Sequence, residues 1–593
     1  MFKRRLRTVF QIIFALAALA VLVHSQDDVP MRAMKDELAR SVSQIQLEKM
    51  DKPYFIAYRM DDLDHTSVSA TLGSITEEQP NHMRLIGVEV RVGDYALDNS
   101  NYVSLRSFAG GGAGMFSSIR QAPLDDNYGQ IRSTFWLATD AQYKKALEDL
   151  SAKRAALENR NHGNDVPDFS KEPVATEFEA KEKTAANLEQ LKSLARALSA
   201  VFRSMPDIYT SSVDLEYRNS YTRYLNSEGS SFTRAQPVFK LEISARTQAP
   251  NGTPIGDSID LYGRTAADLP LQDVLLARTR AMADRILKLR SASSLDRYNG
   301  PVLFEDDAAA EVFAQQFATG LMAVRTPLSD DPRFEAFFNQ MLSQLGGGSF
   351  VDKIGGRVLP DFVSVTDNPL AADYKGAKLL GSSKIDDDAV KTRETALVEH
   401  GMLKTLLATR VPVKAVPEST GSRRGWGAAP SNLFVISDKS STREQLRQEL
   451  LKRAKDRGLD YGIIIRHVGG GAAANFMKMA MRMARQNQAG SSLAEVYKLF
   501  PDGHEELVQG IEIADMTPAN FRDIVAVGDT PFVYTDEFIP RIGALFSLGV
   551  SATSDVPVVS CVVPPLLFEE VSLVKSEGPF PNPPISPSPL AKQ

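Results

Sequence analysis

The sequence predicts an α+β protein with two folded parts. Its 593 residues are enough for two to four domains. The first half mixes helical and strand patterns, whereas the second half alternates strand patterns with loops and has few helical ones. Hydrophobic residues make up 43% and charged residues 24%, which is ordinary for a globular protein. This composition excludes collagen-like, wholly disordered and polytopic membrane proteins.

The first residues have the pattern of an export signal. Basic side chains at positions 3, 4, 5 and 7 precede a nearly unbroken apolar stretch over 9–23. That stretch is shorter than the roughly 20 residues that a membrane-spanning helix needs. We therefore expect a signal peptide over 1–25 and a chain exported to the periplasm or beyond the cell. If the signal is not cleaved, it is an N-terminal membrane anchor.

The first folded part is predicted to span 31–298. Residues 31–50 have helical spacing, and 84–97 alternate apolar and polar side chains as a half-buried strand does. Thr139 and Gln142 have the spacing of a capping box at the start of a helix. The further predicted helices are 139–158, 181–203 and 271–291, and the short predicted strands are 213–217, 221–225, 238–245 and 258–262. Gly229 is expected to take a positive φ in a tight turn over 226–229.

The second folded part is predicted to span 299–575, after a boundary near Pro301. It is expected to consist mainly of strands and loops. Residues 576–593 are rich in proline and are predicted to be a disordered tail.

Most common catalytic motifs are absent from the sequence. It has no phosphate-binding loop, no dinucleotide fingerprint and no serine-hydrolase elbow. The single cysteine, Cys561, excludes an internal disulfide and a cysteine-based zinc site. The 68 basic residues against 74 acidic residues argue against general affinity for nucleic acid.

The histidines do not predict a metal site. His504 begins a sequence like a zinc-protease motif, but the second histidine is missing because positions 508 and 509 are Val and Gln. His400 and His467 are not at helical ligand spacing. Asp386, Asp387 and Asp388 could hold a hard cation, but they lack the spacing of a calcium loop. A solvated turn is the favoured interpretation of these three residues.

One loop, 419–427, has the composition of a peptide-binding surface. Arg423 and Arg424 supply guanidinium groups, and Trp426 supplies an aromatic face. Such side chains suit a peptide carboxylate or backbone. An exposed loop with a partly buried tryptophan explains the same residues equally well.

Several segments, taken in order, resemble the TldD/PmbA family, also called peptidase U62 or modulator of DNA gyrase. They are NSEG at 226–229, GRVLP at 356–360, SVTDNP at 364–369, DDDAVKT at 386–392, LVEHGML at 397–403, STGSRR at 419–424 and NL at 432–433. The resemblance implies an N-terminal α/β domain and a C-terminal domain built on a large, mostly antiparallel β-structure. It also implies dimers and a chamber that admits short or unfolded peptides.

The resemblance also points to the place where family members of the TldD type bind zinc. In those members a helix carries His-Glu-x-x-x-His. Ligands five residues apart differ by about 140° on an ideal helix, so such a helix must be locally distorted. The matching helix here is predicted over 307–324. Ala314 and Thr319 stand where the histidines would be, and Gln315 stands where the glutamate would be. The chain is similar in this respect to PmbA (TldE)-type members, which lack the motif.

The sequence therefore predicts an exported family member that is not catalytic by itself. Its expected role is a peptide-binding subunit that pairs with a TldD-type chain or with itself, with zinc only in the catalytic partner. Peptide contacts are predicted at Arg423, Arg424 and Asn432. The alternative is an active metal-dependent peptidase with an unrecognised site, for which His400, His467 and residues 386–388 are the candidates. A third interpretation is a secreted binding or structural protein with neither partner nor chemistry.

Overall fold

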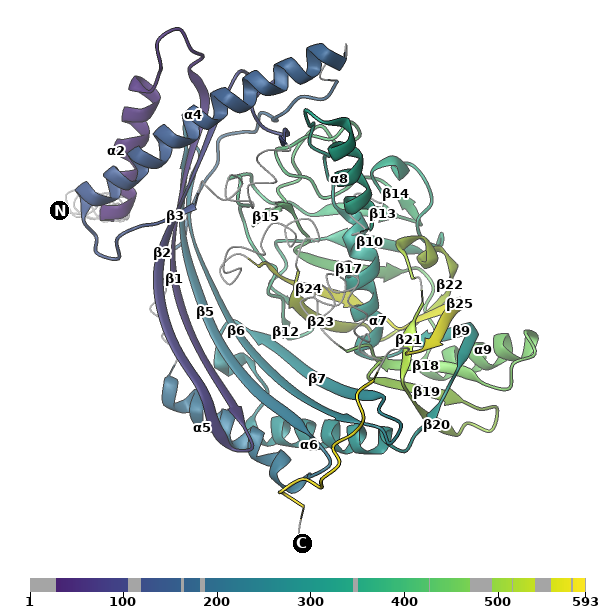
Figure 1. Ribbon diagram of the computed structural model, residues 1–593. Helices are drawn as coiled ribbons and strands as arrows, with labels where there is room; N and C mark the ends of the chain where they lie inside the picture. The colour runs from purple at the N-terminus through teal and green to yellow at the C-terminus, as the bar shows by residue number, and fades with distance from the viewer. Residues whose placement is uncertain are drawn as a thin grey trace, which may run out of the picture.

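The computed structural model describes residues 28–104, 119–160, 165–181, 187–344, 350–425, 427–469, 493–514, 516–538, 556–576 and 580–591. The predicted signal peptide and Trp426 lie outside the described residues. In Figure 1 long curved strands from the first part of the chain pass along one side of the second part. No helix within the described ranges is long and apolar enough to span a membrane.

The N-terminal sheet is the larger feature of the first part. Its strands are β1 (Pro53–Thr71), β2 (Ser74–Val92), β3 (Ile119–Gln121), β4 (Thr176–Phe178), β5 (Thr210–Asn226), β6 (Ser231–Gln248) and β7 (Pro254–Gly263). They run in the order β3-β2-β1-β5-β6-β4, and β7 pairs with β6. The pairing is antiparallel except for the short parallel contact between β4 and β6. Gly229, with φ 100°, turns the chain between β5 and β6 as predicted.

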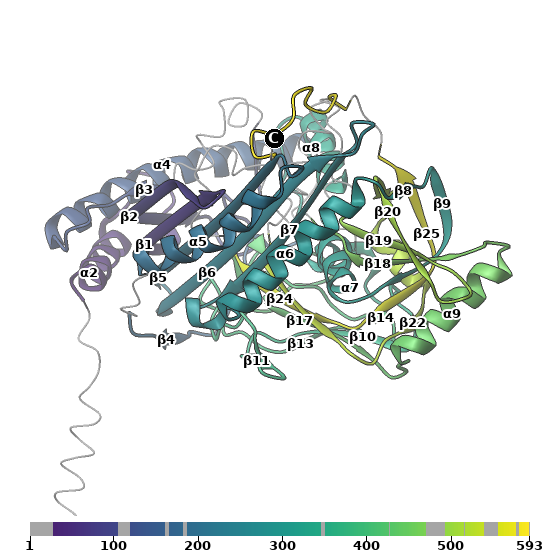
Figure 2. The ribbon, with the colours of Figure 1, turned by 90° about the horizontal axis from the view of Figure 1, so that it is seen from below.

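Helices cover one face of this sheet. They are α2 (Val29–Gln44), α4 (Tyr128–Arg160), α5 (Leu188–Ser199) and α6 (Gln272–Leu289). Figure 2 shows α5 and α6 lying over the strands of the sheet. Side chains alternate along β1, so Ile56 and Tyr58 pack under the helices, while Phe55 faces the other way and belongs to a hydrophobic cluster that includes Ile385 of the second part. The helix-free face of the sheet therefore meets the C-terminal half.

The C-terminal half contains two larger sheets. One has the order β14-β13-β10-β17-β24-β23 and the other β21-β25-β9-β18-β19-β20-β8, with β22 beside β25. Their strands are β8 (Ser293–Ser294), β9 (Arg297–Phe304), β10 (Val363–Asp367), β13 (Thr395–Glu399), β14 (Met402–Leu403), β17 (Asn432–Ser437), β18 (Gly462–His467), β19 (Glu495–Leu499), β20 (Glu505–Gln509), β21 (Ile511–Ile513), β22 (Ile524–Val527), β23 (Phe532–Glu537), β24 (Val558–Val563) and β25 (Leu566–Lys575). Two small hairpins, β11 (Asp373–Tyr374) with β12 (Ala377–Lys378) and β15 (Arg423–Arg424) with β16 (Gly427–Ala428), lie outside the larger sheets. The predicted α+β class is confirmed.

One irregular helix lies in the core that the two sheets share. It begins as α7 (Asp307–Val312), continues as a π turn, η3 (Phe313–Phe317), and ends as a 3-10 turn, η4 (Ala318–Leu321). The amide of Ala318 donates to the carbonyl of Phe313, five residues earlier. The helix expected over 307–324 is thus confirmed over 307–321, and it is distorted at the place where the family resemblance requires a distortion.

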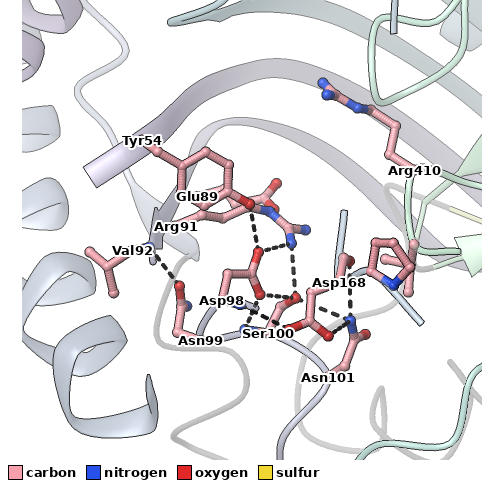
Figure 3. A network of polar contacts seen from close by, with 12 residues as sticks. Tyr54, Glu89, Arg91, Val92, Asp98, Asn99, Ser100, Asn101, Asp168 and Arg410 are labelled. Carbon is pink, nitrogen blue, oxygen red and sulfur yellow. Dashed lines mark hydrogen bonds and ion pairs between the residues drawn. The ribbon is translucent and has the colours of Figure 1, made fainter. Parts of the chain in front are cut away.

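A polar network stabilises one junction between the halves (Figure 3). Arg91 donates to Asp98 and Ser100 at 2.8 and 2.9 Å, and Asp98 also accepts from Tyr54 at 2.7 Å. Arg410 enters from the C-terminal half, its guanidinium 3.9 Å from the centre of the Phe169 ring. It also donates to both carboxylate oxygens of Glu228. Because charged and aromatic contacts satisfy it, this buried arginine ties the sheet to the other half.

Several sequence predictions differ from the structure. Thr139 is not a helix cap: α4 begins at Tyr128, and the Thr139 hydroxyl donates to the Phe135 carbonyl inside the helix. The four short strands predicted between 213 and 262 belong to the three long strands β5, β6 and β7. The helix α9 (Arg443–Asp456) was not predicted. Most of its residues are charged or polar, and its buried side consists only of Leu446, Leu450 and Ala454, which is a weak helical pattern.

The described part of the C-terminal tail has no regular secondary structure. Within residues 580–591, the carbonyl of Pro581 accepts a hydrogen bond from the side-chain amide of Gln248 at 2.9 Å. The tail therefore contacts the hairpin of β6 and β7.

Candidate functional site

A cavity of about 370 Å³ lies between the N-terminal sheet and the C-terminal half. Its N-terminal wall includes His65, Arg218 and Arg234, and its C-terminal wall includes Lys384 and Arg424. Leu370, Ala372 and residues 556–558 add apolar surface. Both halves of the chain are therefore needed to form this cavity, and its wall combines apolar surface with basic side chains and with the acidic side chains of Asp64, Glu179 and Asp387.

Asp386, Asp387 and Asp388 form the carboxylate loop beside this cavity. All three are buried, so the solvated turn favoured from the sequence is wrong. Asp386 accepts from the amides of Asp388 and Val390 at 2.9 and 2.8 Å, and from the amide of Arg423 at 3.0 Å. Burial and the neighbouring Asp388 raise the pKa of Asp386 to about 8. The loop is a folded, internally bonded element.

Asp387 joins the carboxylate loop to the N-terminal sheet. It forms a buried ion pair with Arg234, and Arg234 also donates to the carbonyl of Ile385 at 2.9 Å. Burial alone would raise the pKa of Asp387, but Arg234 and Arg59 lower it below its usual range. Asp387 therefore stays ionised and holds the two walls of the cavity together.

The three predicted peptide-contact residues have different positions. Arg424 lines the cavity and donates to the Gly381 carbonyl at 2.8 Å and the Ser431 hydroxyl at 2.6 Å. Arg423 is partly exposed and lies 3.3 Å from Asp388. Asn432 is fully buried, and its amide group bonds to the backbone of residues 368, 371 and 381. Asn432 therefore positions the wall of the cavity.

Sequence reasoning missed the N-terminal wall. Arg218 and Arg234 lie on β5 and β6, more than a hundred residues from the 419–427 loop. One indication of them was present in the sequence. An arginine at an inward-facing position of a strand must be paired, because an unpaired buried charge is costly. The partner could be known only from the fold.

The helix that the family resemblance aligns with the zinc motif carries Ala314, Gln315 and Thr319 at the positions expected for the motif. Ala314 and Thr319 are buried, and the Thr319 hydroxyl donates to the Gln316 carbonyl at 3.1 Å. A methyl group cannot bind a metal ion, and Gln315 cannot act as a general base. The π turn nevertheless brings positions 314 and 319 onto nearly the same face. The residues at these positions therefore do not fit a zinc ion.

The three histidines singled out from the sequence do not form one site. His400 is exposed in the turn between β13 and β14 and lies 3.1 Å from Asp438. His504 is exposed and stacks on Phe500. His467 ends β18 in the other sheet, where it meets Asp307 and Glu311 at 3.3 and 3.0 Å. Only the last of these three histidines has a set of possible metal ligands around it among the described residues.

Comparison with known proteins defines the class. Residues 299–575 match the family described as the PmbA/TldA metallopeptidase C-terminal domain, so this part of the chain belongs to the PmbA/TldD family. A metalloprotease of Methanocaldococcus jannaschii is 37% identical over 92 residues, which cover 14% of this chain and 19% of that relative. The match thus spans about a fifth of the curated relative's length.

Solved structures extend the likeness to the fold of nearly the whole chain. A protein of Thermotoga maritima described as a modulator of a DNA gyrase has a TM-score of 0.54 and 17% identity, covering 88% of this chain and 96% of that one. TldE from Thermococcus kodakarensis has a TM-score of 0.51 and 13% identity, covering 91% and 100%. A modulator of DNA gyrase from Bacteroides thetaiotaomicron has a TM-score of 0.52 and 11% identity, covering 92% and 98%. At these identities the likeness establishes the fold alone.

Proposed function

We propose that this chain is an exported member of the PmbA/TldD family that binds peptides and does not cleave them by itself. The observation that carries the proposal is the motif helix, which keeps its π turn but has Ala314, Gln315 and Thr319 at the motif positions. A chain that lacks these ligands cannot activate water there.

The proposed peptide site is the cavity between the two halves. Its apolar surface at Leu370 and Ala372 suits peptide side chains, and the side chain of Arg424 in its lining suits carbonyl or carboxylate oxygens. Asn432 holds the wall that presents them. A volume of about 370 Å³ accommodates a few residues of an extended peptide.

Filling the cavity tests this assignment. Ala372 is exposed at the cavity, so Ala372→Trp adds bulk without disturbing the core. We expect it to weaken binding of a fluorescein-labelled unfolded peptide by at least about tenfold in an anisotropy titration. Ala336→Trp, at an exposed position of α8 (Pro332–Gln344), is the matched control and should leave binding unchanged. Equal binding by both variants would contradict the peptide site.

The proposed partner is a TldD-type chain, with self-association as the other possibility. Support comes from the family domain and from the fold shared with TldE. Co-expression with a TldD-type chain of the same cell should yield a complex that cleaves peptides, whereas this chain alone should not. Failure to associate with any such chain would refute the partner role. Export is tested separately by fractionation, with the mature N-terminus near residue 26 in the periplasmic or extracellular fraction.

The second candidate function is an active metal-dependent peptidase that uses another site. The observation that favours it is the position of His467 beside two carboxylates. Peptide cleavage by the lone chain that is lost in His467→Gln and kept in His400→Gln would establish it in place of the subunit role.

A further inference from the structure

A group of three side chains lies where β18, α7 and β7 meet. We call Asp307, Glu311 and His467 the histidine cluster. Asp307 and Glu311 are four residues apart on α7 and so lie on one face of the helix. Nδ1 of His467 lies 3.3 Å from Oδ2 of Asp307 and 3.0 Å from Oε1 of Glu311. None of these residues stands at a motif-equivalent position of the helix.

The other ring nitrogen fixes how His467 is turned. Nε2 lies 3.2 Å from the carbonyl oxygen of Ser258 and 3.2 Å from Oδ1 of Asp257, both on β7. Both partners are acceptors, so Nε2 carries a proton and donates. Donation from one ring nitrogen to a carbonyl or a carboxylate is what orients a metal-binding histidine, because it leaves the lone pair on the other nitrogen. That other nitrogen, Nδ1, points at Asp307 and Glu311.

Nδ1 has no hydrogen-bond partner of acceptable geometry among the described residues, although it is buried. The two carboxylate oxygens lie at ion-pair distance from it. A buried nitrogen in this position is costly unless something binds it. Glu311 is itself buried, and its second oxygen accepts from the amide of Val468 at 2.6 Å. One oxygen of Glu311 is thereby fixed, and the other faces the histidine.

Negative charge exceeds positive charge at this place. Arg285 pairs with Asp257, which leaves Asp307 and Glu311 facing a single imidazole. A bound cation would balance this charge.

We propose that Asp307, Glu311 and His467 bind one divalent transition-metal cation, with zinc the best match. One imidazole nitrogen and two carboxylate oxygens form a zinc ligand set, whereas calcium and magnesium prefer oxygen ligands alone. A tetrahedral ion with bonds of about 2.1 Å keeps its ligand atoms about 3.4 Å apart. The distances from Nδ1 are 3.3 and 3.0 Å, and all three ligand atoms lie within 4.8 Å of one another. Only small side-chain shifts are needed. This proposal does not rest on the peptide-binding function.

The test is a zinc titration of the full chain after removal of metal by a chelator. Calorimetry and elemental analysis should give one zinc per chain. Asp307→Asn should weaken zinc binding by at least about tenfold, and His467→Gln should abolish it at the same site. His400→Gln is the matched control, because His400 is an exposed histidine that also faces a carboxylate, and it should bind zinc like the unchanged chain.

The rival occupant is a proton, since an imidazolium would also satisfy both carboxylates. In that case the chain binds no zinc, or binds it equally in the unchanged chain and in Asp307→Asn, and either result would overturn the proposal. A preference for calcium or magnesium over zinc would overturn it too. If His467→Gln fails to fold, Asp307→Asn decides, because the Asp307 side chain is 32% exposed and its loss leaves the core intact. None of these readouts depends on peptide cleavage.

Discussion

The carboxylate loop and the histidine cluster both place acidic side chains where the two halves of the molecule meet, yet the charges of these side chains are balanced in opposite ways. In the carboxylate loop, Asp387 has Arg234, and Asp386 has three backbone amides. In the histidine cluster, two carboxylates face one ring nitrogen that makes no hydrogen bond among the described residues. Buried negative charge therefore does not by itself define a ligand site. The loop is completed by the protein, and the cluster needs an additional cation.

The largest effect on stability should come from breaking the ion pair of the carboxylate loop. Arg234→Met leaves Asp387 ionised and buried without its main partner, which should lower the free energy of unfolding by about 3–5 kcal/mol. Urea unfolding followed by circular dichroism measures this. Arg443→Met is the control and should cost less than about 1 kcal/mol, because Arg443 is half-exposed and Glu305 also pairs with Arg447 and Arg466.

The double variant separates the charge from the packing. If the loss in Arg234→Met comes from an unpaired carboxylate, adding Asp387→Asn should restore a substantial part of the stability. Equal losses in the single and double variants would show that the arginine acts through packing, and the contrast between the two regions would then fail.

A smaller effect concerns pH and the acidic region around β7. Burial and the charges of Glu242 and Asp536 raise the pKa of Asp260 to about 7. In the folded chain Asp260 therefore holds its proton at pH values where the unfolded chain releases it. The resulting stability is complete below about pH 4 and is lost as the pH rises through 7.

Asp260→Asn should remove that pH dependence. With allowance for solvent screening, the unchanged chain should lose roughly 1–2 kcal/mol more than the variant between pH 5 and pH 8, measured by urea unfolding in the presence of a chelator. Parallel pH profiles for the two proteins would mean that Asp260 is ionised throughout and that the region is less acidic than we infer.

The smallest effect should be at His400. Its ion pair with Asp438 is exposed on both sides, so His400→Gln should change the free energy of unfolding by no more than about 0.5 kcal/mol. A loss above 1 kcal/mol in the same unfolding assay would show that exposure is a poor guide to the value of these histidine–carboxylate pairs.

Much of the fold could be predicted from the sequence because its patterns are local. The helices α2, α5 and α6 and the turn at Gly229 follow from spacing and from the backbone freedom of glycine. Strand length could not be predicted in the same way. The strands β5 and β6 run through charged residues such as Arg223 and Arg234, which interrupt an apolar pattern but are paired in the structure.

The candidate site was predictable only in part, for a related reason. Arg424 was predicted from the composition of its loop, and the absence of zinc ligands from the motif helix was predicted from the family resemblance. Arg218, Arg234 and the histidine cluster depend on contacts between segments that are far apart in the chain, and no spacing rule reports those. His467 and Glu311, for example, are brought together by the parallel pairing of β18 with β9, which directly precedes α7.

The π turn in the motif helix has a consequence for engineering. Phe317, in the π turn, packs in a cluster of tilted and edge-on rings, 5.0 to 5.2 Å from Phe313, Phe350 and Phe521, ring centre to ring centre. These contacts are made by side chains outside positions 314, 315 and 319, so the aromatic packing of this helix does not depend on which residues occupy those positions. Histidines could therefore be introduced at positions 314 and 319 of this helix without a change in its backbone.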